Sequence, residues 1–170
     1  MKKIVFVIIL FVYFNGISQE EGVEKNLIGI QSKENFQQAP YAEWFNPNYK
    51  DATLDAAIVN KIKKHLKGVS IKAFMGTWCG DSQHETPIFY KLMDAIDFDY
   101  KNLTMIAVNR SKETPDNLQE GYNITNVPTF IFYKKGKEIG RFVEYPRETL
   151  EKDVLKIVSG KPYKHSYEEE

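Results

Sequence analysis

Apolar residues along the chain alternate between the spacing that forms helices and the spacing that forms buried strands. Helix-type spacing appears over residues 54–66, 82–96 and 147–159. Short apolar runs of the strand type appear over residues 71–75, 103–108, 129–133 and 138–143. Strands separated by helices pair in parallel through right-handed crossovers, whereas the last two runs form a hairpin. The pattern predicts an α/β fold, a small mixed central sheet flanked by helices on both faces.

Short polar residues and glycines predict where these elements begin and end. Thr53 is the predicted cap of the first helix, and Asp55 suits the positive end of that helix. Gly68 is predicted to end the same helix, and Gly160 to end the last one. Lys134–Gly136 form the predicted turn of the hairpin.

The first eighteen residues have the composition of a secretory signal. Lys2 and Lys3 precede an unbroken apolar stretch over residues 4–14, and the small residues Gly16 and Ser18 follow it. This order predicts cleavage after Ser18 and export, in a bacterium to the periplasm. An uncleaved membrane anchor is the alternative, although the stretch is short for a membrane span. No apolar run of about 20 residues follows, so no membrane span is predicted after the signal is removed.

Three further segments are polar and irregular. Residues 19–50 are predicted to form an N-terminal arm that docks its aromatic residues Tyr41, Trp44 and Phe45 on the edge of the core, before a turn at Asn46-Pro47-Asn48. A polar loop over residues 111–117 is followed by a predicted short turn or helix. The globular domain is therefore assigned to residues 51–160, and the charged residues 161–170 are predicted to be a disordered tail.

Composition restricts the classes of function. The 170 residues carry 23 basic and 23 acidic side chains, so there is no basic footprint for nucleic acid. The single cysteine, Cys79, excludes a disulfide within the chain. A lone thiol in an exported protein is either buried and inert or exposed and reactive.

Cys79 lies between a predicted buried strand and a predicted helix, in the motif Thr77-Trp78-Cys79-Gly80-Asp81-Ser82. Free N–H groups and a partial positive charge at a helix N-terminus stabilise a thiolate, so Cys79 is predicted to lose its proton easily. Ser82 follows one turn later and is predicted to donate its hydroxyl proton to the sulfur. Trp78 is expected to flank the sulfur, and the carboxylate of Asp81 opposes ionisation.

Residues 78–82 resemble the thioredoxin active-site motif Trp-Cys-Gly-Pro-Cys. Pro87 matches the proline that kinks the following helix in thioredoxins, and residues 124–129 resemble the loop whose cis-proline faces the active-site cysteine. Gly136 matches the glycine of the closing hairpin. The resemblance covers about residues 52–160 and implies a thioredoxin-like fold. It also implies a cis bond between Val127 and Pro128 that leaves the Val127 backbone free to pair with an extended peptide.

The departures from that family define the predicted chemistry. Ser82 stands where thioredoxins have the second cysteine, Asp81 replaces the intervening proline, and Ala73 replaces a buried acid. One sulfur can attack a disulfide and form a mixed disulfide, but release then needs another thiol. His84 lies close to Cys79 and Asp81 in sequence, but no metal-ligand spacing is present, and neither a metal nor a cofactor is predicted.

Two functional hypotheses remain open. In the first, a monothiol oxidoreductase acts through Cys79 and Ser82 on protein or small-molecule thiols and disulfides. In the second, the chain is a peptide-binding or chaperone-like module that has lost catalysis. Both use one substrate surface, predicted to comprise Trp78, Gly80, Asp81, Val127 and Pro128. We expect a monomer in either case.

Overall fold

The computed structural model describes residues 26–169. The predicted signal, its cleavage after Ser18 and the first residues of the N-terminal arm lie outside this range. Within residues 26–169 no helix combines the length and apolar character needed to cross a membrane.

The described residues form a five-stranded mixed sheet in the order β1-β3-β2-β4-β5. The strands are β1 (Gly29–Gln31), β2 (Val69–Met75), β3 (Leu103–Ala107), β4 (Thr129–Lys134) and β5 (Lys137–Val143). β2 and β3 run parallel, while β2–β4, β4–β5 and β1–β3 are antiparallel pairs. The predicted mixed sheet with a closing hairpin is confirmed, and β1 is an additional strand at one edge.

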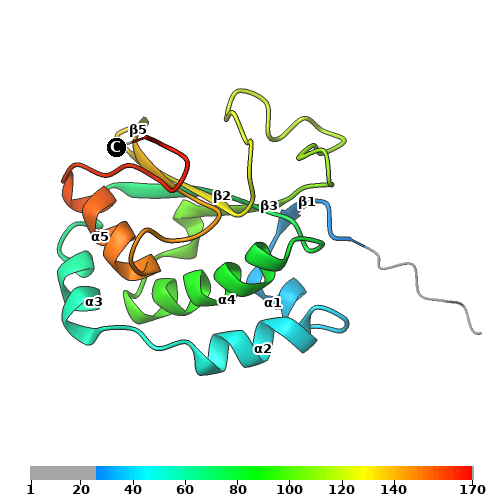
Figure 1. Cartoon of the computed structure of the whole chain (residues 1–170), viewed down its shortest axis with the longest axis horizontal. Coiled ribbons are helices and arrows are strands. Elements are labelled where there is room, and N and C mark those ends of the chain that lie inside the picture. The colour runs from blue at the N-terminus through cyan, green and yellow to red at the C-terminus, as the bar shows by residue number, and fades with distance from the viewer. Residues whose placement is uncertain (1–25, 170) are drawn as a thin grey trace, which may run out of the picture.

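The α-helices gather on one face of the sheet (Figure 1). They are α1 (Lys33–Phe36), α2 (Ala42–Asp51), α3 (Ala56–Lys63), α4 (Gly80–Ala95) and α5 (Leu150–Ser159), with a single 3₁₀ turn, η1 (Tyr100–Asn102), before β3. The prediction of helices on both faces is therefore wrong.

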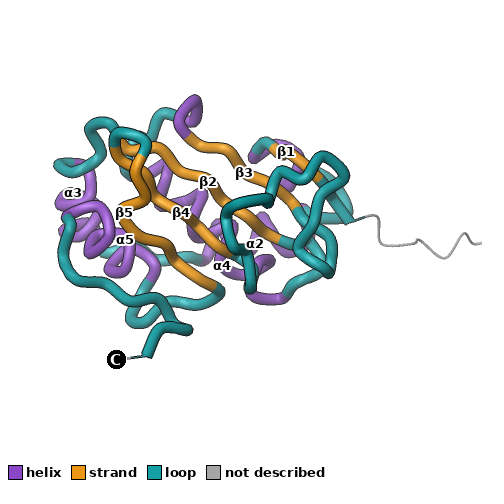
Figure 2. Tube along the Cα trace, turned by 90° about the horizontal axis from the view of Figure 1, so that it is seen from above, coloured by secondary structure: helices purple, strands orange, loops and turns teal. Residues whose placement is uncertain are grey.

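A long loop over residues 108–128 covers the other face instead, as the view from above shows (Figure 2). Of the short turn or helix predicted after residue 117, the structure has the turn, over residues 118–121. Lys112, Asn117, Gly121 and Asn123 all have positive φ. Such residues turn the chain repeatedly, which is incompatible with a continuous helix.

Two apolar clusters of unequal size hold the layers together. The larger one lies between the sheet and the helices and includes the fully buried Phe89, which stacks on Phe130 at 4.1 Å. The smaller one, on the loop side, contains Phe74, Ile106, Val108, Val127 and Ile131. Trp78 and Cys79 pack against this smaller cluster, so the motif lies at the edge of a core rather than inside one.

The N-terminal arm is more regular than predicted. Its aromatic residues do dock, because Phe36 and Phe45 are fully buried in the larger cluster. The expected turn at Asn46-Pro47-Asn48 instead lies inside α2. The aromatic face of this helix is buried against α4. The free energy gained by this burial exceeds the cost of the helical hydrogen bond that Pro47 cannot donate.

Helix ends agree with the sequence signals in part. Asp55, rather than Thr53, caps α3, because its carboxylate accepts from the backbone N–H groups of Ala57 at 2.7 Å and Ile58 at 3.2 Å. α3 ends before Gly68, whereas Gly160 ends α5 in the left-handed conformation as predicted. The hairpin turn is also as predicted, with positive φ at Lys135 and Gly136.

The last residues fold back on the domain, which differs from the expected disordered tail. Tyr163 packs against the larger cluster, and its hydroxyl donates to Asp153 on α5 at 3.2 Å. The Arg147 guanidinium donates to the backbone carbonyls of His165 at 3.1 Å and Glu168 at 2.7 Å. An aromatic anchor and two main-chain contacts order this charged segment as far as residue 169.

Candidate functional site

Cys79 occupies the N-cap position of α4, immediately after the loop that leaves β2. Its N–H donates to the Gly76 carbonyl at 3.0 Å, and its own carbonyl accepts from the Gln83 N–H at 2.9 Å. The residue is partly exposed. The structure thus places the only thiol of the chain where the sequence predicts it, at the N-terminal tip of a sixteen-residue helix.

The sulfur faces the loop that ends at Pro128. The Cys79 thiol donates to the carbonyl oxygen of Val127 at 3.2 Å, and the peptide bond between Val127 and Pro128 is cis. The predicted cis bond is confirmed, as is its position opposite the cysteine. The Val127 carbonyl thus already accepts one hydrogen bond, from the thiol, and its second lone pair remains for a donor of the substrate.

Ser82 does not contact the sulfur, contrary to prediction. It is fully buried, and its hydroxyl oxygen accepts from the backbone N–H of Gly76 at 3.1 Å. Within the described residues no hydrogen bond joins Ser82 to Cys79. Because its side chain turns inward beneath the loop, Ser82 fixes the backbone that carries the cysteine. Its role in this structure is positioning.

The Trp78 indole is locked beside the cysteine from two directions. Its ring nitrogen donates to the Val108 carbonyl at 2.8 Å. A Cβ atom added to Gly76 would lie 2.5 Å from the indole, so only glycine at this position lets the ring lie flat on the backbone. The Arg110 guanidinium covers the ring, 5.2 Å from its centroid. Sequence reasoning identified Trp78 but did not find Gly76 or Arg110.

Residues from the N-terminal segment hold the same loop. The buried Thr77 hydroxyl donates to the side chain of Asn26 and accepts from the N–H of Leu27, both at 3.2 Å. The Gln83 amide donates to the Thr77 carbonyl at 2.7 Å, and Asn48 on α2 donates to the Gln83 carbonyl at 3.1 Å. No sequence motif predicts the contacts of Asn26, Leu27 and Asn48, because their partners lie 35 or more positions away.

Acidic groups near the motif differ in exposure. Asp81 is exposed in the first turn of α4, beside Gly80, whereas Ala73 on β2 is fully buried without any charge. Glu85, six residues after the cysteine, is only 6% exposed. Burial raises the pKa of the Glu85 carboxyl, and the neighbouring His84 ring nitrogen, 3.0 Å from one carboxyl oxygen, partly offsets this.

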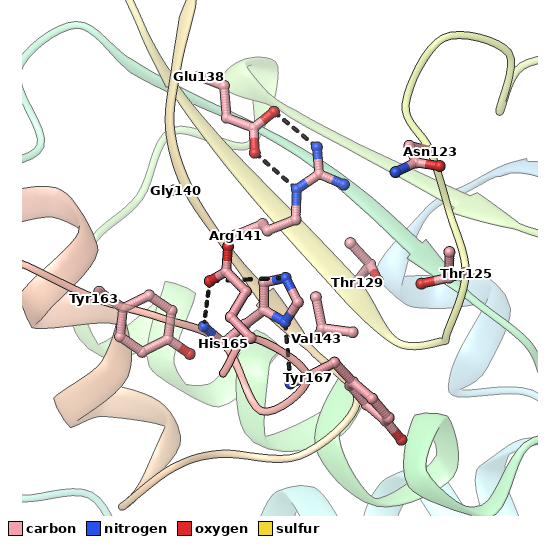
Figure 3. A pocket seen from close by; sticks show the side chains of 11 residues that line it. Asn123, Thr125, Thr129, Glu138, Gly140, Arg141, Val143, Tyr163, His165 and Tyr167 are labelled. Atoms are coloured by element: carbon pink, nitrogen blue, oxygen red, sulfur yellow. Dashed lines mark hydrogen bonds and ion pairs between the residues drawn. The ribbon is translucent and has the colours of Figure 1, made fainter. Parts of the chain in front are cut away.

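A polar cavity of about 440 Å³ lies between β5, the loop that carries Thr125 and the C-terminal segment (Figure 3). Thr125 and Thr129 line it from that loop, and the C-terminal segment closes it with His165. Arg141 also lines the cavity, and its guanidinium pairs with the Glu138 carboxylate at 2.7 Å. The charge of Arg141 is therefore already neutralised. Burial lowers the pKa of His165. Among residues 26–169 no cluster of metal-ligating side chains occurs.

A mixed sheet in the order β1-β3-β2-β4-β5, a cysteine at the N-terminus of the following helix and a cis-proline opposite it define a protein of the thioredoxin-fold class. Comparison with known sequences leads to the same class. A family model described as thioredoxin matches residues 31–156, so the chain belongs to the thioredoxin family.

Individual relatives agree over part of their length. A thioredoxin-like protein of Acanthamoeba polyphaga mimivirus is 33% identical over 89 residues, which are 52% of this chain and 62% of that protein. Thioredoxin H2 of Arabidopsis thaliana is 33% identical over 99 residues, 58% of this chain and 68% of that protein. A crystal structure of a Pseudomonas aeruginosa protein of unknown function superposes with a TM-score of 0.59 at 16% identity, covering 78% of this chain and 93% of that one, a likeness of fold alone.

Proposed function

We propose that this protein is a monothiol thiol–disulfide exchange protein that captures disulfides through Cys79. The observation that carries the proposal is the position of the sulfur. It is partly exposed at the N-terminus of α4 and faces the cis-proline loop. Membership of the thioredoxin family supports a thiol–disulfide redox role in general.

One sulfur limits the reaction to exchange. The thiol first gives its proton to solvent, and the thiolate attacks one sulfur of a substrate disulfide. A bond forms between Cys79 and that sulfur, the substrate S–S bond breaks, and the second substrate sulfur leaves as a thiolate that takes up a proton. A thiol of the substrate itself, or a separate small thiol, then repeats the exchange on the mixed disulfide and frees Cys79. The number of disulfides is unchanged throughout.

A second function is favoured by the contacts around the sulfur. The Val127 carbonyl accepts the thiol proton, Ser82 bonds to Gly76, and no buried acid occupies position 73. None of these three features favours the thiolate. A Cys79 that stays protonated leaves a surface that binds peptides without a covalent step. Cys79→Ala would then keep partner binding, whereas a capture protein loses its partners in that variant.

The alkylation rate of Cys79 distinguishes the two functions. Because the chain has one cysteine, a single thioether per molecule in the mass spectrum reports on this site alone. Iodoacetamide is expected to modify the native protein at a rate comparable with that of the urea-unfolded chain, and to leave Cys79→Ser unmodified. A thiol that reacts only after unfolding would contradict the exchange function.

Export through residues 1–18 is also part of the proposal. The charged start, apolar stretch and small residues before Gln19 support it. Expression of the full chain in a bacterium, followed by mass measurement of the periplasmic protein, is expected to give a product that begins at Gln19. Recovery of the uncut chain in the membrane fraction would favour the anchor alternative.

A further inference from the structure

Arg110 is an exposed cation that lies against Trp78 of the Cys79 motif. It lies two residues after Val108, whose carbonyl accepts from the Trp78 indole, and its guanidinium covers the face of that indole at 5.2 Å. Trp78 precedes Cys79 directly, and both pack on the smaller apolar cluster. The Arg110 guanidinium therefore stacks on an indole ring that is itself held beside the Cys79 sulfur.

The Arg110 guanidinium has no ionic partner among the described residues. The chain has three arginines. Arg141 forms a two-pronged pair with Glu138, and Arg147 donates to two carbonyls of the C-terminal segment. Across residues 26–169, in contrast, Arg110 has no ion pair and no hydrogen bond, and its guanidinium contacts the Trp78 ring. Asp81, the exposed acid of the motif, forms no ion pair with it.

We propose that Arg110 binds a carboxylate of the substrate, so that Cys79 selects disulfides with an acidic group next to the S–S bond. The proposal rests on the exchange function above and names its substrate class. A guanidinium presents two parallel N–H donors that match a carboxylate, and it is more weakly hydrated than an ammonium group. Stacking on Trp78 holds the guanidinium in place before the substrate arrives, which lowers the entropic cost of binding.

The test compares two small disulfides that differ in charge. Dithiobis(nitrobenzoate) carries a carboxylate on each ring, whereas dithiodipyridine carries none, and both release a coloured thiol. Arg110→Met keeps the length of the side chain without its charge. It is expected to slow the reaction of the carboxylated disulfide by about fivefold and to change the neutral one by less than about twofold. Added salt is expected to slow the wild type with the carboxylated disulfide only.

Lys112→Met is the matched control, because it removes one positive charge from the same loop without touching Trp78. It is expected to leave both rates nearly unchanged. A control variant that slows the carboxylated disulfide as much as Arg110→Met would overturn the proposal, because the effect would then be one of net charge. The proposal would also be overturned if Arg110→Met slowed the reactions of both disulfides equally. That result would mean that Arg110 acts on the reactivity of the Cys79 thiol and not on the substrate carboxylate.

Peptide disulfides separate the possible sources of the carboxylate. Two peptides that carry Glu or Gln next to a disulfide-bonded cysteine are compared in the same assay. Preference for the Glu peptide supports a protein substrate, and preference confined to the small disulfide supports a low-molecular-weight acid. If the wild type reacts with none of the disulfides, the exchange function itself fails. That result is distinct from a reactive Cys79 that shows no charge preference, which overturns only the role of Arg110.

Discussion

Glu85 carries a carboxyl group into the contact between α4 and α5, where one of its oxygens has no hydrogen-bond partner among the described residues. Asp153, on α5, is fully buried and likewise has one unpartnered oxygen. Burial raises the pKa of both groups. Two acids in this position cost stability whenever they are ionised, because a buried charge without a full set of partners loses its hydration.

Glu85→Gln is therefore expected to stabilise the protein at alkaline pH. The Glu85 pKa in the folded chain lies above its ordinary 4.5. Its protonated form thus contributes stability that is complete below pH 4.5 and is lost as the pH rises through the raised value. At pH 8 the variant should exceed the wild type by about 1 kcal/mol in urea unfolding, and the difference should vanish below about pH 4.

Glu120→Gln is the control for this measurement, since Glu120 is exposed on the loop. Its unfolding free energy should stay within about 0.5 kcal/mol of the wild type at both pH values. Asp153 is present in every variant, so its titration cancels to first order. A Glu85→Gln variant that is less stable than the wild type at pH 8 would show that the carboxylate has partners in solution.

Single residues of the site were predictable where a local motif marks them. The strand, cysteine and helix pattern located Cys79, and the likeness of residues 124–129 to the thioredoxin loop located Pro128. The Ser82 hydroxyl was assigned to the wrong partner. Its spacing from Cys79 permits contact with the sulfur, but the choice between the sulfur and the Gly76 N–H depends on which way the side chain packs. Arg110 was missed because stacking across 32 positions leaves no local signal.

Helices and strands with regular apolar spacing were predicted from the sequence. Elements that depend on contacts with other parts of the fold were not. The predicted strand over residues 129–133 became β4, and the helix over residues 82–96 became α4 with small shifts at its ends. α2 was read as a turn because Pro47 and its flanking asparagines favour turns locally. Its helical state depends on aromatic contacts with α4, such as Phe45 on Tyr90.

Phe45→Ala tests whether α2 belongs to the folding unit. The ring is fully buried and contacts Phe36, Tyr49 and Tyr90. Removal of such a ring leaves a cavity and is expected to lower the unfolding free energy by about 3–5 kcal/mol in urea titration. Ile30→Ala, at a site that is 66% exposed, should change it by less than about 0.5 kcal/mol. Equal small effects in both variants would mean that the N-terminal segment is only loosely attached.

The whole molecule is organised around one large cluster that the N-terminal segment and the thioredoxin domain share. The order of elements was enough to predict a mixed sheet. The order of elements does not predict which face the helices cover. A strand that is apolar on both sides indicates that both faces are buried, but it does not indicate whether a helix or a loop covers each face. Here helices cover one side and the loop over residues 108–128 covers the other (Figure 1), while Tyr163 of the C-terminal segment packs on the larger cluster.

A shared cluster predicts a single cooperative transition. Trp44 lies on α2 and Trp78 at the site, and they are the only tryptophans of the chain. Trp44→Phe and Trp78→Phe each leave one fluorescent reporter. In each variant the urea midpoint from fluorescence should coincide with the midpoint from circular dichroism. A Trp44 signal that changes at lower urea than the circular dichroism of the same variant would show that α2 unfolds separately.

The Thr77 hydroxyl donates to the Asn26 side chain and accepts from the Leu27 N–H, and these two hydrogen bonds connect the first described residues with the segment just before Cys79. A mechanical load applied to residue 26 is thus transmitted directly to the peptide segment that presents the sulfur. In a tethered or fused form of the protein, tension on this end would displace the Cys79 loop before it reached the sheet.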